Sequence, residues 1–504
     1  MSVQSFGRVS RPPHPVLFQL LYERSFLDDQ RNVLPDLLRI DAAHVLMLAQ
    51  QRILPGETAS ALLDVNATLF DRVMAGETIF EPPPSHRGMY VVYENEYIRR
   101  LGGERGGAAH VARSRNDINA TVTRMRVRRE LLGALGECAE LAAALRKLAL
   151  EHLETVMSGF THLQPAQPST FGHYLAAVLS ELVRTSTWLA DSYPVVNRSP
   201  MGAAAGVGTS FPVDRNQVAR LLGFTGPIAN SIDAVGSRDY VVHVLSGLAL
   251  LGTTLTRLAT DLQAWASAAY GFLGWPDEMV STSSIMPQKR NAFVLENVRG
   301  QSVQATGELM NALMGLKNTP YTNSVEVSSE VSAHLYPALA STRKALRLMT
   351  LLIAHVEVQP ERMRGFLRGA DTTMTALADF LVARHGLAFR AAHDAVSALV
   401  ARKADGTELT PAAAKAGLDE ILRASALALD EAELARVLAP DLCVRAASSG
   451  GGPAPDAVRD QLDALAAQSI SPRLEAWSRE LDEAEVTLSK SITTARARAT
   501  PGHP

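Results

Sequence analysis

Three short polar segments contain the residue types that would bind and transform a carboxylate substrate. They are residues 110–119 (HVARSRNDIN), 161–168 (THLQPAQP) and 281–291 (STSSIMPQKRN). In the first segment, Arg115 and Asn116 stand where a helix is expected to start. A guanidinium fork and the free N–H groups of a helix start both suit an anion. Taken alone, this segment is more often simply a capped, solvated helix start.

The second and third segments offer groups for proton transfer and for holding charge. Thr161, His162 and Gln164 precede an expected helix, and histidine is the side chain that changes its charge nearest neutral pH. A lone loop histidine is more often a hydrogen-bonding residue, and consecutive serines usually just form a loop. Lys289 and Asn291, after those serines, add a cation and an amide. None of the three segments identifies a function by itself.

The elements that must position these segments are expected to be long helices. Apolar residues recur at helical spacing, and alternating strand patterns are scarce. Helices of this length that run side by side predict an all-α protein built on a bundle. The expected helices lie in residues 40–63 (two helices broken at Pro55–Gly56), in 131–156, from Gln167–Pro168 onward, in 240–270 and in 293–318.

The length and the charge balance limit the class of protein. The chain has 504 residues and a net charge of 49 − 52 = −3, and 47% of its residues are hydrophobic. That length predicts about three domains, which we place at 1–113 (N-terminal helical), 114–364 (central helix bundle) and 365–504 (C-terminal helical). Cys138 and Cys443 are far apart, so a disulfide scaffold and a zinc module are excluded and a reducing compartment is expected. The near-neutral charge argues against a nucleic-acid partner.

One stretch has the composition of a membrane span. Residues 240–256 contain no Asp, Glu, Lys or Arg, but they include His243 and are slightly shorter than a usual span. A helix buried on all sides in a large bundle gives the same pattern. Residues 1–15 lack the apolar region of a secretion signal. We therefore expect a soluble, cytoplasmic protein that has no membrane partner.

The three polar segments, in their order along the chain and in their residues, resemble sequence motifs of the aspartase/fumarase superfamily. Its signature loop, GSSxMPxKxN, reads TSSIMPQKRN here, with Thr282 in place of the usual glycine. Within that superfamily, the sequences of the motifs are most similar to those of argininosuccinate lyase. The matching stretches are RSRND at 113–117, THLQPAQP at 161–168, FPVDR at 211–215, NSIDA at 230–234, LADFLVARHGLAFRAAHDAV at 377–396 and GGPAPDAVRDQL at 451–462.

The resemblance implies elimination of an amine from an N-substituted L-aspartate, which leaves fumarate. It places the catalytic base at Ser283 and an assisting histidine at His162, with Glu296 orienting that histidine and Lys289 binding a substrate carboxylate. Stabilisation of the charged intermediate is expected to be the largest contribution to the rate. The resemblance also implies substrate binding by Arg115, Asn116, Thr161, Gln164, Ser284, Asn291, Tyr321 and Glu326.

The resemblance further implies an assembly and the absence of a cofactor. The expected fold has three domains, and its central long-helix bundle forms the helical core of a homotetramer. Three subunits contribute to each site, because the polar segments are too far apart on long helices to meet within one chain. No metal and no organic cofactor is expected.

The chain departs from argininosuccinate lyase after Tyr321. Without gaps, Glu326 stands where that family has glutamine, and Ser329 stands where it has lysine. The residues expected to act on the fumarate half of the substrate match the family. Those expected to recognise the amine differ from it. We therefore expect a divergent lyase, such as one resembling ethylenediamine-disuccinate lyase. The alternatives are an ordinary argininosuccinate lyase and a catalytically silent structural homologue.

Overall fold

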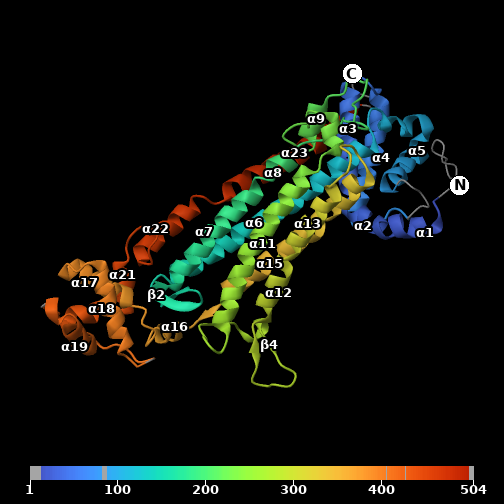
Figure 1. Cartoon of the computed structure of the whole chain (residues 1–504). Coiled ribbons are helices and arrows are strands. Elements are labelled where there is room, and N and C mark those ends of the chain that lie inside the picture. Colours follow the sequence, from blue (N-terminus) through green and yellow to red (C-terminus); the bar gives the residue numbers. More distant parts are fainter. Residues whose placement is uncertain (1–12, 82–87, 405, 426, 499–504) are drawn as a thin grey trace.

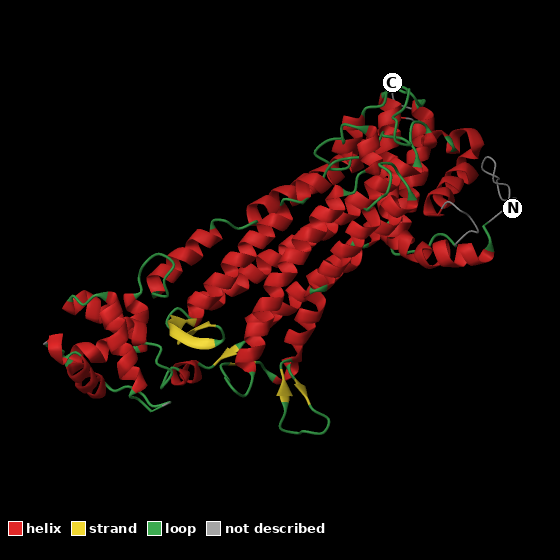
Figure 2. Cartoon of the chain, in the orientation of Figure 1, coloured by secondary structure: helices red, strands yellow, loops and turns green. Residues whose placement is uncertain are grey.

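The computed structural model describes residues 13–81, 88–404, 406–425 and 427–498, and it is dominated by helices (Figure 2). Long helices run side by side through an elongated molecule (Figure 1). The all-α prediction is confirmed. The bundle consists of α6 (Arg115–Glu151), α7 (Phe171–Ala190), α11 (Asp239–Ala266), α12 (Phe293–Ser302), α13 (Gln304–Leu316) and α15 (Leu335–Ala354).

The remaining helices form a group at each end of the bundle, and two of them run back along it (Figure 1). At the N-terminal end lie α1 (Pro15–Phe18), α2 (Arg24–Asn32), α3 (Leu34–Gln50), α4 (Gly56–Met74), α5 (Gly88–Gly106), α8 (Tyr193–Val196), α9 (Arg215–Leu221), α10 (Ser231–Gly236) and α14 (Val331–Ala333). At the other end lie α16 (Pro360–Phe366), α17 (Met374–His385), α18 (Phe389–Ala401), α19 (Pro411–Ile421), α20 (Glu431–Val437) and α21 (Pro440–Ala446). The chain returns along the bundle through α22 (Pro455–Ala466) and α23 (Ser471–Arg498).

The few strands in the described residues form three two-stranded antiparallel sheets. The first joins β1 (Val156–Thr161) to β2 (Gln164–Thr170), and it follows directly after α6. The others join β3 (Leu273–Gly274) to β6 (Glu357–Val358), and β4 (Ser281–Thr282) to β5 (Arg290–Asn291). All three lie at the bundle end opposite the N-terminal helices (Figure 2).

The apolar helix α11 forms the centre of the bundle. Leu245, Leu248, Leu251, Leu255 and Leu258 lie along it at spacings of three and four residues, and none is more than 2% exposed. By length and composition alone, α11 could cross a membrane, but 56% of its most apolar window is buried inside the protein. The core helix of a soluble protein passes the same test.

Several helix boundaries differ from the sequence expectations, two of them at the helices next to the β1–β2 hairpin. The helix expected at 131–156 begins much earlier, at Arg115. The helix expected to start at Gln167–Pro168 begins instead at Phe171, because the preceding residues pair as strand β2. Its N-cap is Thr170, whose hydroxyl accepts a hydrogen bond from the backbone N–H of His173 at 3.0 Å. The break at Pro55–Gly56 is confirmed.

Most of the buried apolar residues in the described part of the chain fall in three clusters. The largest cluster fills the bundle. A second packs the N-terminal helices together with Leu488 of α23, and a third, small cluster joins α17, α18, α19 and α20. The domain boundaries near residues 113 and 365 remain predictions.

The close contact between α11 and α12 depends on Gly252, which has no side chain. A Cβ on Gly252 would overlap the carbonyl oxygen of Ser302, whereas a Cβ on Gly136 of α6 would meet only Leu474, at an ordinary 3.8 Å. We predict that Gly252→Ala lowers the free energy of unfolding by about 1–3 kcal/mol, as overpacking does. Gly136→Ala, the matched control, should raise it by about 0.5–1 kcal/mol through helix propensity. Urea unfolding measures both, and equal effects would contradict the close approach.

Candidate active site

The predicted site residues fall at opposite ends of the bundle. Helix α6 has 37 residues and is therefore about 55 Å long at 1.5 Å per residue. Arg115 lies at its start, and the β1–β2 hairpin that carries His162 follows its end. Helix α11, with 28 residues, spans about 42 Å in the same way, and the segment with Ser283 follows its C-terminal end. One chain therefore does not bring all the predicted residues together.

At the start of α6, the buried carboxylate of Asp117 holds two segments in place. Its Oδ1 accepts hydrogen bonds from the backbone N–H groups of Ser114 (2.9 Å) and Ile118 (3.0 Å). Its Oδ2 accepts from the N–H groups of Gly202 (3.1 Å) and Ala204 (2.9 Å). Burial raises the pKa of Asp117 to about 6, and the N–H donors act in the opposite direction. The glycine-rich segment is thereby fixed against the helix start.

Near Asp117, side chains from three segments and one backbone carbonyl form further hydrogen bonds. The Asn116 amide donates to the carbonyl oxygen of Ala205 at 3.1 Å and accepts from the Asn323 amide at 3.0 Å. The Tyr321 hydroxyl donates to Asp233 at 3.0 Å. Two of the predicted binding residues, Asn116 and Tyr321, thus belong to the polar groups gathered at this end. The first residue of α6, Arg115, is exposed at the same end.

The residues expected to recognise the amine follow Tyr321 at the same end. Glu326 begins a π-helical turn, Glu326–Glu330, and its side chain is exposed. The Ser324 hydroxyl, which hydrogen-bonds to the carboxylate, lowers the pKa of Glu326. Among the described residues, no Lys or Arg forms an ion pair with Glu326. The turn therefore presents negative charge to solvent.

At the other end, the β1–β2 hairpin carries Thr161, His162 and Gln164. Thr161 pairs with Gln164, and the two residues between them, His162 and Leu163, have φ values of 52° and 61°. Two successive left-handed residues are typical of a type I′ turn, which normally contains Asn and Gly. Holding non-glycine residues there costs about 1–3 kcal/mol each. The turn presents both the imidazole and Leu163, which is 81% exposed, to solvent.

Aromatic packing holds the base of this hairpin against the bundle. The ring of Phe160 lies 6.3 Å from Trp265, 6.0 Å from Tyr270 and 5.9 Å from Phe366. Such contacts contribute roughly 0.5–1.5 kcal/mol per pair beyond burial. This anchor, next to Thr161, offsets part of the strain in the turn.

The serine segment forms a loop between β4 and β5. The Ser283 Oγ accepts hydrogen bonds from the backbone N–H groups of Ile285 (3.3 Å) and Met286 (3.1 Å). Arg290 fixes the base of the loop through an ion pair with Asp277 and a 3.0 Å hydrogen bond to the carbonyl oxygen of Trp275. Two N–H donors directed at one hydroxyl oxygen would stabilise negative charge on that oxygen.

The other predicted residues of this segment are accessible. The side chains of Ser284 and Lys289 are exposed, and that of Asn291 is half-buried. Glu296, in the first turn of α12, accepts a hydrogen bond from the Gln263 amide at 3.0 Å. Within the part of the chain that the structure describes, Glu296 forms no hydrogen bond or ion pair with His162. The predicted pairing of these two residues is therefore not formed inside one chain.

Sequence reasoning missed four residues that build the two half-sites: Asp117, Asn323, Asp233 and Gln263. Asp117 and Asp233 lie in the RSRND and NSIDA stretches, so their motifs were visible although their hydrogen-bonding roles were not. Asn323 and Gln263 had no recognisable signal. Among the described residues there is no group of three or more His, Cys, Asp or Glu side chains that could hold a metal ion.

Comparisons with known proteins identify the family of the chain. The chain matches the family model described as Lyase over residues 91–307 and the model described as Argininosuccinate lyase C-terminal over residues 371–445. It is 34% identical to argininosuccinate lyase 1 of Shouchella clausii over 91% of this chain and 92% of that protein. It is 36% identical to argininosuccinate lyase of Methanocorpusculum labreanum over 86% of each chain.

Solved structures show the same fold. EDDS lyase in complex with formate superimposes with a TM-score of 0.83, at 28% identity over 98% of both chains. An EDDS lyase variant with bound fumarate gives a TM-score of 0.82 at the same identity and coverage. The class II fumarase of Schistosoma mansoni, at 15% identity and a TM-score of 0.66 over 81% of this chain and 90% of that one, shares the fold alone.

The fold and the polar segments at the helix ends thus define a lyase built like fumarase and aspartase. The chain belongs to the aspartase/fumarase superfamily, close to argininosuccinate lyase. It is a carbon–nitrogen lyase that forms fumarate.

The four hydrogen bonds of Asp117 generate a stability prediction. In the variant Asp117→Asn, the new NH2 group would face backbone N–H groups that need an acceptor. We therefore predict that this change lowers the free energy of unfolding by about 1–3 kcal/mol. The control is Asp214→Asn, because the Asp214 carboxylate is the N-cap of α9 and Asn caps a helix equally well. Urea unfolding should show a change near zero for the control, and equal losses in both variants would contradict the special role of Asp117.

Proposed function

We propose that the enzyme removes an amine other than arginine from an N-substituted L-aspartate, with Ser283 as the base. The observation that carries the assignment of the base is the pair of N–H groups directed at the Ser283 Oγ. A serine hydroxyl is a poor base in water, and it serves only where donors stabilise its alkoxide and water is excluded. The loop of β4 and β5 supplies the donors, and its closure over substrate would exclude the water.

The proposed reaction has one proton abstraction and one bond cleavage. The Ser283 alkoxide takes the proton from the carbon next to a substrate carboxylate, and Lys289 holds the doubly charged intermediate. The C–N bonding pair then leaves with the amine, which receives a proton with the help of His162, and fumarate remains. Glu296 orients His162 and raises its basicity, as a carboxylate beside an imidazole does. Substrate carboxylates are held by Arg115, Asn116, Thr161, Gln164, Ser284 and Asn291.

We propose that a cytoplasmic homotetramer completes the site. The helix lengths separate the Arg115 end from the Ser283 loop within one chain, which supports a site that combines groups from three subunits. The bundle also leaves large apolar side chains uncovered on α7, α11 and α13, which is typical of an interaction surface. Between 42% and 65% of each is exposed: Trp188, Leu250, Met310, Leu313 and Met314.

The charge near Tyr321 supports an amine that differs from arginine. Relative to the glutamine and lysine of argininosuccinate lyases, Glu326 and Ser329 lower the local charge by two units. Glu326 is exposed and ionised, with no cation paired to it among the described residues. The carboxylate of a departing arginine would be repelled there, and an ammonium group would be attracted. We therefore propose an amine whose far end is cationic or uncharged.

Ordinary argininosuccinate lyase is the second candidate, because its members are 34–36% identical to this chain over most of its length. A catalytically silent homologue is the third. Against silence, the chain retains Ser283, His162, Lys289 and Glu296, which a scaffold would not need. Incubation of the protein with fumarate and a panel of amines, followed by mass spectrometry of the adducts, tests the proposed reaction directly.

The shared site predicts complementation between two inactive chains. Ser283→Ala and His162→Ala should each reduce elimination by about 10²–10⁴-fold, because each removes a proton-transfer group. Mixed and reassembled chains should regain activity, since some hybrid sites then contain both intact groups. Fumarate absorbance measures the rate, and sedimentation measures the assembly.

The control is a mixture of two Ser283→Ala preparations, which should stay inactive. A fully active wild-type monomer would overturn the shared site, and a Ser283→Ala enzyme with near-wild-type activity would overturn the assignment of the base.

The charge argument predicts a change of substrate preference. We expect weak cleavage of argininosuccinate by the wild type, and a gain of about tenfold in kcat/KM in the double variant Glu326→Gln, Ser329→Lys, because the repulsion of the arginine carboxylate is removed. The control is Glu330→Gln, which removes one negative charge from the same turn. Efficient cleavage of argininosuccinate by the wild type, or no gain in the double variant, would contradict the proposal.

A further inference from the structure

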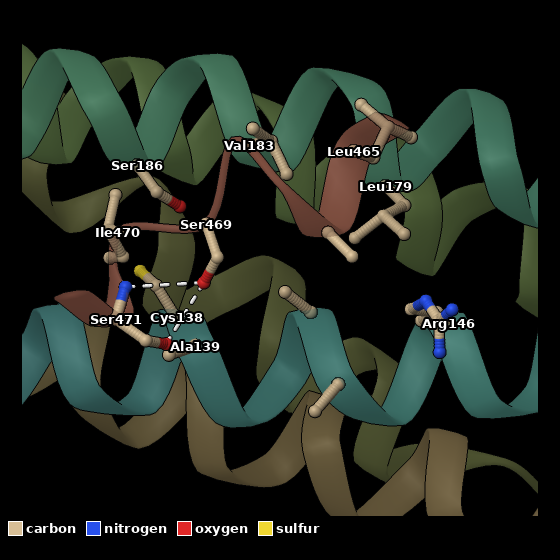
Figure 3. Close-up of a pocket in the computed structure, with 13 residues that line it drawn as sticks. Cys138, Ala139, Arg146, Leu179, Val183, Ser186, Leu465, Ser469, Ile470 and Ser471 are labelled. Carbon is tan, nitrogen blue, oxygen red and sulfur yellow. Dashed lines mark hydrogen bonds between the residues drawn. The ribbon is translucent and has the colours of Figure 1, made fainter. Parts of the chain in front are cut away.

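A cavity of about 210 Å³ lies away from the predicted site residues, between α6, α7 and the segment that links α22 to α23 (Figure 3). Small side chains on α6, among them Ala139 and Ala142, leave this space unfilled opposite Leu179 and Val183 of α7. Protein interiors are normally packed without gaps much larger than a water molecule. An apolar cavity of this size therefore has room for a small organic molecule.

The cavity is apolar along its length. Leu465 and Ile470 of the α22–α23 segment complete the walls. Cys138 also lines it, and burial raises the pKa of this thiol to about 12, so the sulfur stays uncharged. At one end, the hydroxyl groups of Ser469 and Ser471 form a hydrogen bond with each other, with 3.0 Å between the oxygens (Figure 3). An occupant would thus meet mostly carbon and an uncharged sulfur.

The opposite end of the cavity carries a cation, Arg146 (Figure 3). Its Nη2 donates to Asp463 at 2.6 Å. Its Nε is buried and has no hydrogen-bonding partner among the described residues. The Arg146 side chain is 36% exposed, so a ligand oxygen can reach the guanidinium without losing all contact with water.

An arginine that binds two carboxylates occurs elsewhere in this chain. Arg343 donates to Glu130 at 2.6 Å and to Glu137 at 3.0 Å, so one guanidinium bridges two carboxylates. The ion pair with Asp463 therefore leaves Arg146 able to take a second carboxylate through its unused N–H groups.

We propose that this cavity binds a monocarboxylate with an apolar body of about six to eight carbons, a size that follows from its volume. The carboxylate pairs with Arg146, and the body fills the space between α6 and α7. Because a cavity of roughly 150 Å³ accommodates benzene, the present volume suits a slightly larger apolar group. Fumarate has two carboxylates and no apolar body, so the cavity discriminates against the product of the proposed reaction.

Binding in this cavity would stabilise the packing of α22 and α23 along the bundle. The occupant packs against Leu465, near the end of α22, and against Ile470, the residue just before α23. Helix α23 continues to the N-terminal helices, where Glu485 pairs with Arg39 at 3.0 Å and Leu488 is buried. A ligand that binds only the folded state raises Tm by mass action.

The test uses octanoate, 1-octanol and fumarate with the full-length protein. We expect octanoate to raise Tm and to bind by calorimetry about tenfold more tightly than 1-octanol, which corresponds to one charge-assisted hydrogen bond. Arg146→Gln should abolish the preference for octanoate over 1-octanol. The matched control is Lys147→Gln, because Lys147 is the next residue of α6 but is 80% exposed and does not line the cavity.

A filled cavity provides the second variant. Ala142→Leu should abolish octanoate binding, and Ala142→Val replaces it if the leucine variant does not fold. Absence of octanoate binding by the wild type would overturn the proposal. Unchanged binding by a folded cavity-filled variant would also overturn it, as would an equal loss in Arg146→Gln and Lys147→Gln. A displacement of octanoate by fumarate at equal concentration would place octanoate in the lyase site and overturn the separate cavity.

Discussion

The packing of the apolar helix α11 against its neighbours determines where every other feature of the molecule can lie. Its buried leucines fix α7, α12, α13 and α15 around one axis, and Gly252 lets α12 approach closely. Along the buried faces of helices of this length, polar groups are tolerated mainly where they are hydrogen-bonded, because an unpaired polar group there costs several kcal/mol. The polar segments are consequently confined to the two ends of the bundle.

Each end supplies a different part of the proposed site. At the start of α6, Asp117 fixes the helix start and the glycine-rich segment, and so positions Asn116 within a hydrogen-bonded network. At the other end, the strained turn at His162 and the loop of Ser283 are anchored only at their bases and extend into solvent. A rigid end proposed to hold the substrate, with exposed loops that carry the proposed proton-transfer groups, would suit an enzyme whose site closes after binding.

The chain combines a retained reaction with a proposed change of specificity. The groups expected to handle the fumarate half match the family, whereas Glu326 and Ser329 alter the charge where the amine is expected. Since discrimination between substrates depends on differences in transition-state binding, a change of two charges at the proposed amine side of the site would affect which adduct is cleaved. It does not require a change in the fold or in the elimination itself.

The all-α class, the bundle and the superfamily could be predicted from the sequence, because helical periodicity and linear motifs such as RSRND and TSSIMPQKRN are local patterns. The β1–β2 hairpin could not, since Pro165 and Pro168 lie in a strand that pairs with Val156–Thr161. The hydrogen-bond donors to Asp117 could not be predicted either, because Gly202 and Ala204 are more than 80 residues away in the sequence. Hydrogen bonds of that separation, and the cavity beside Arg146, exist only once helices distant in sequence pack together, so they arise from the tertiary structure and have no local signal.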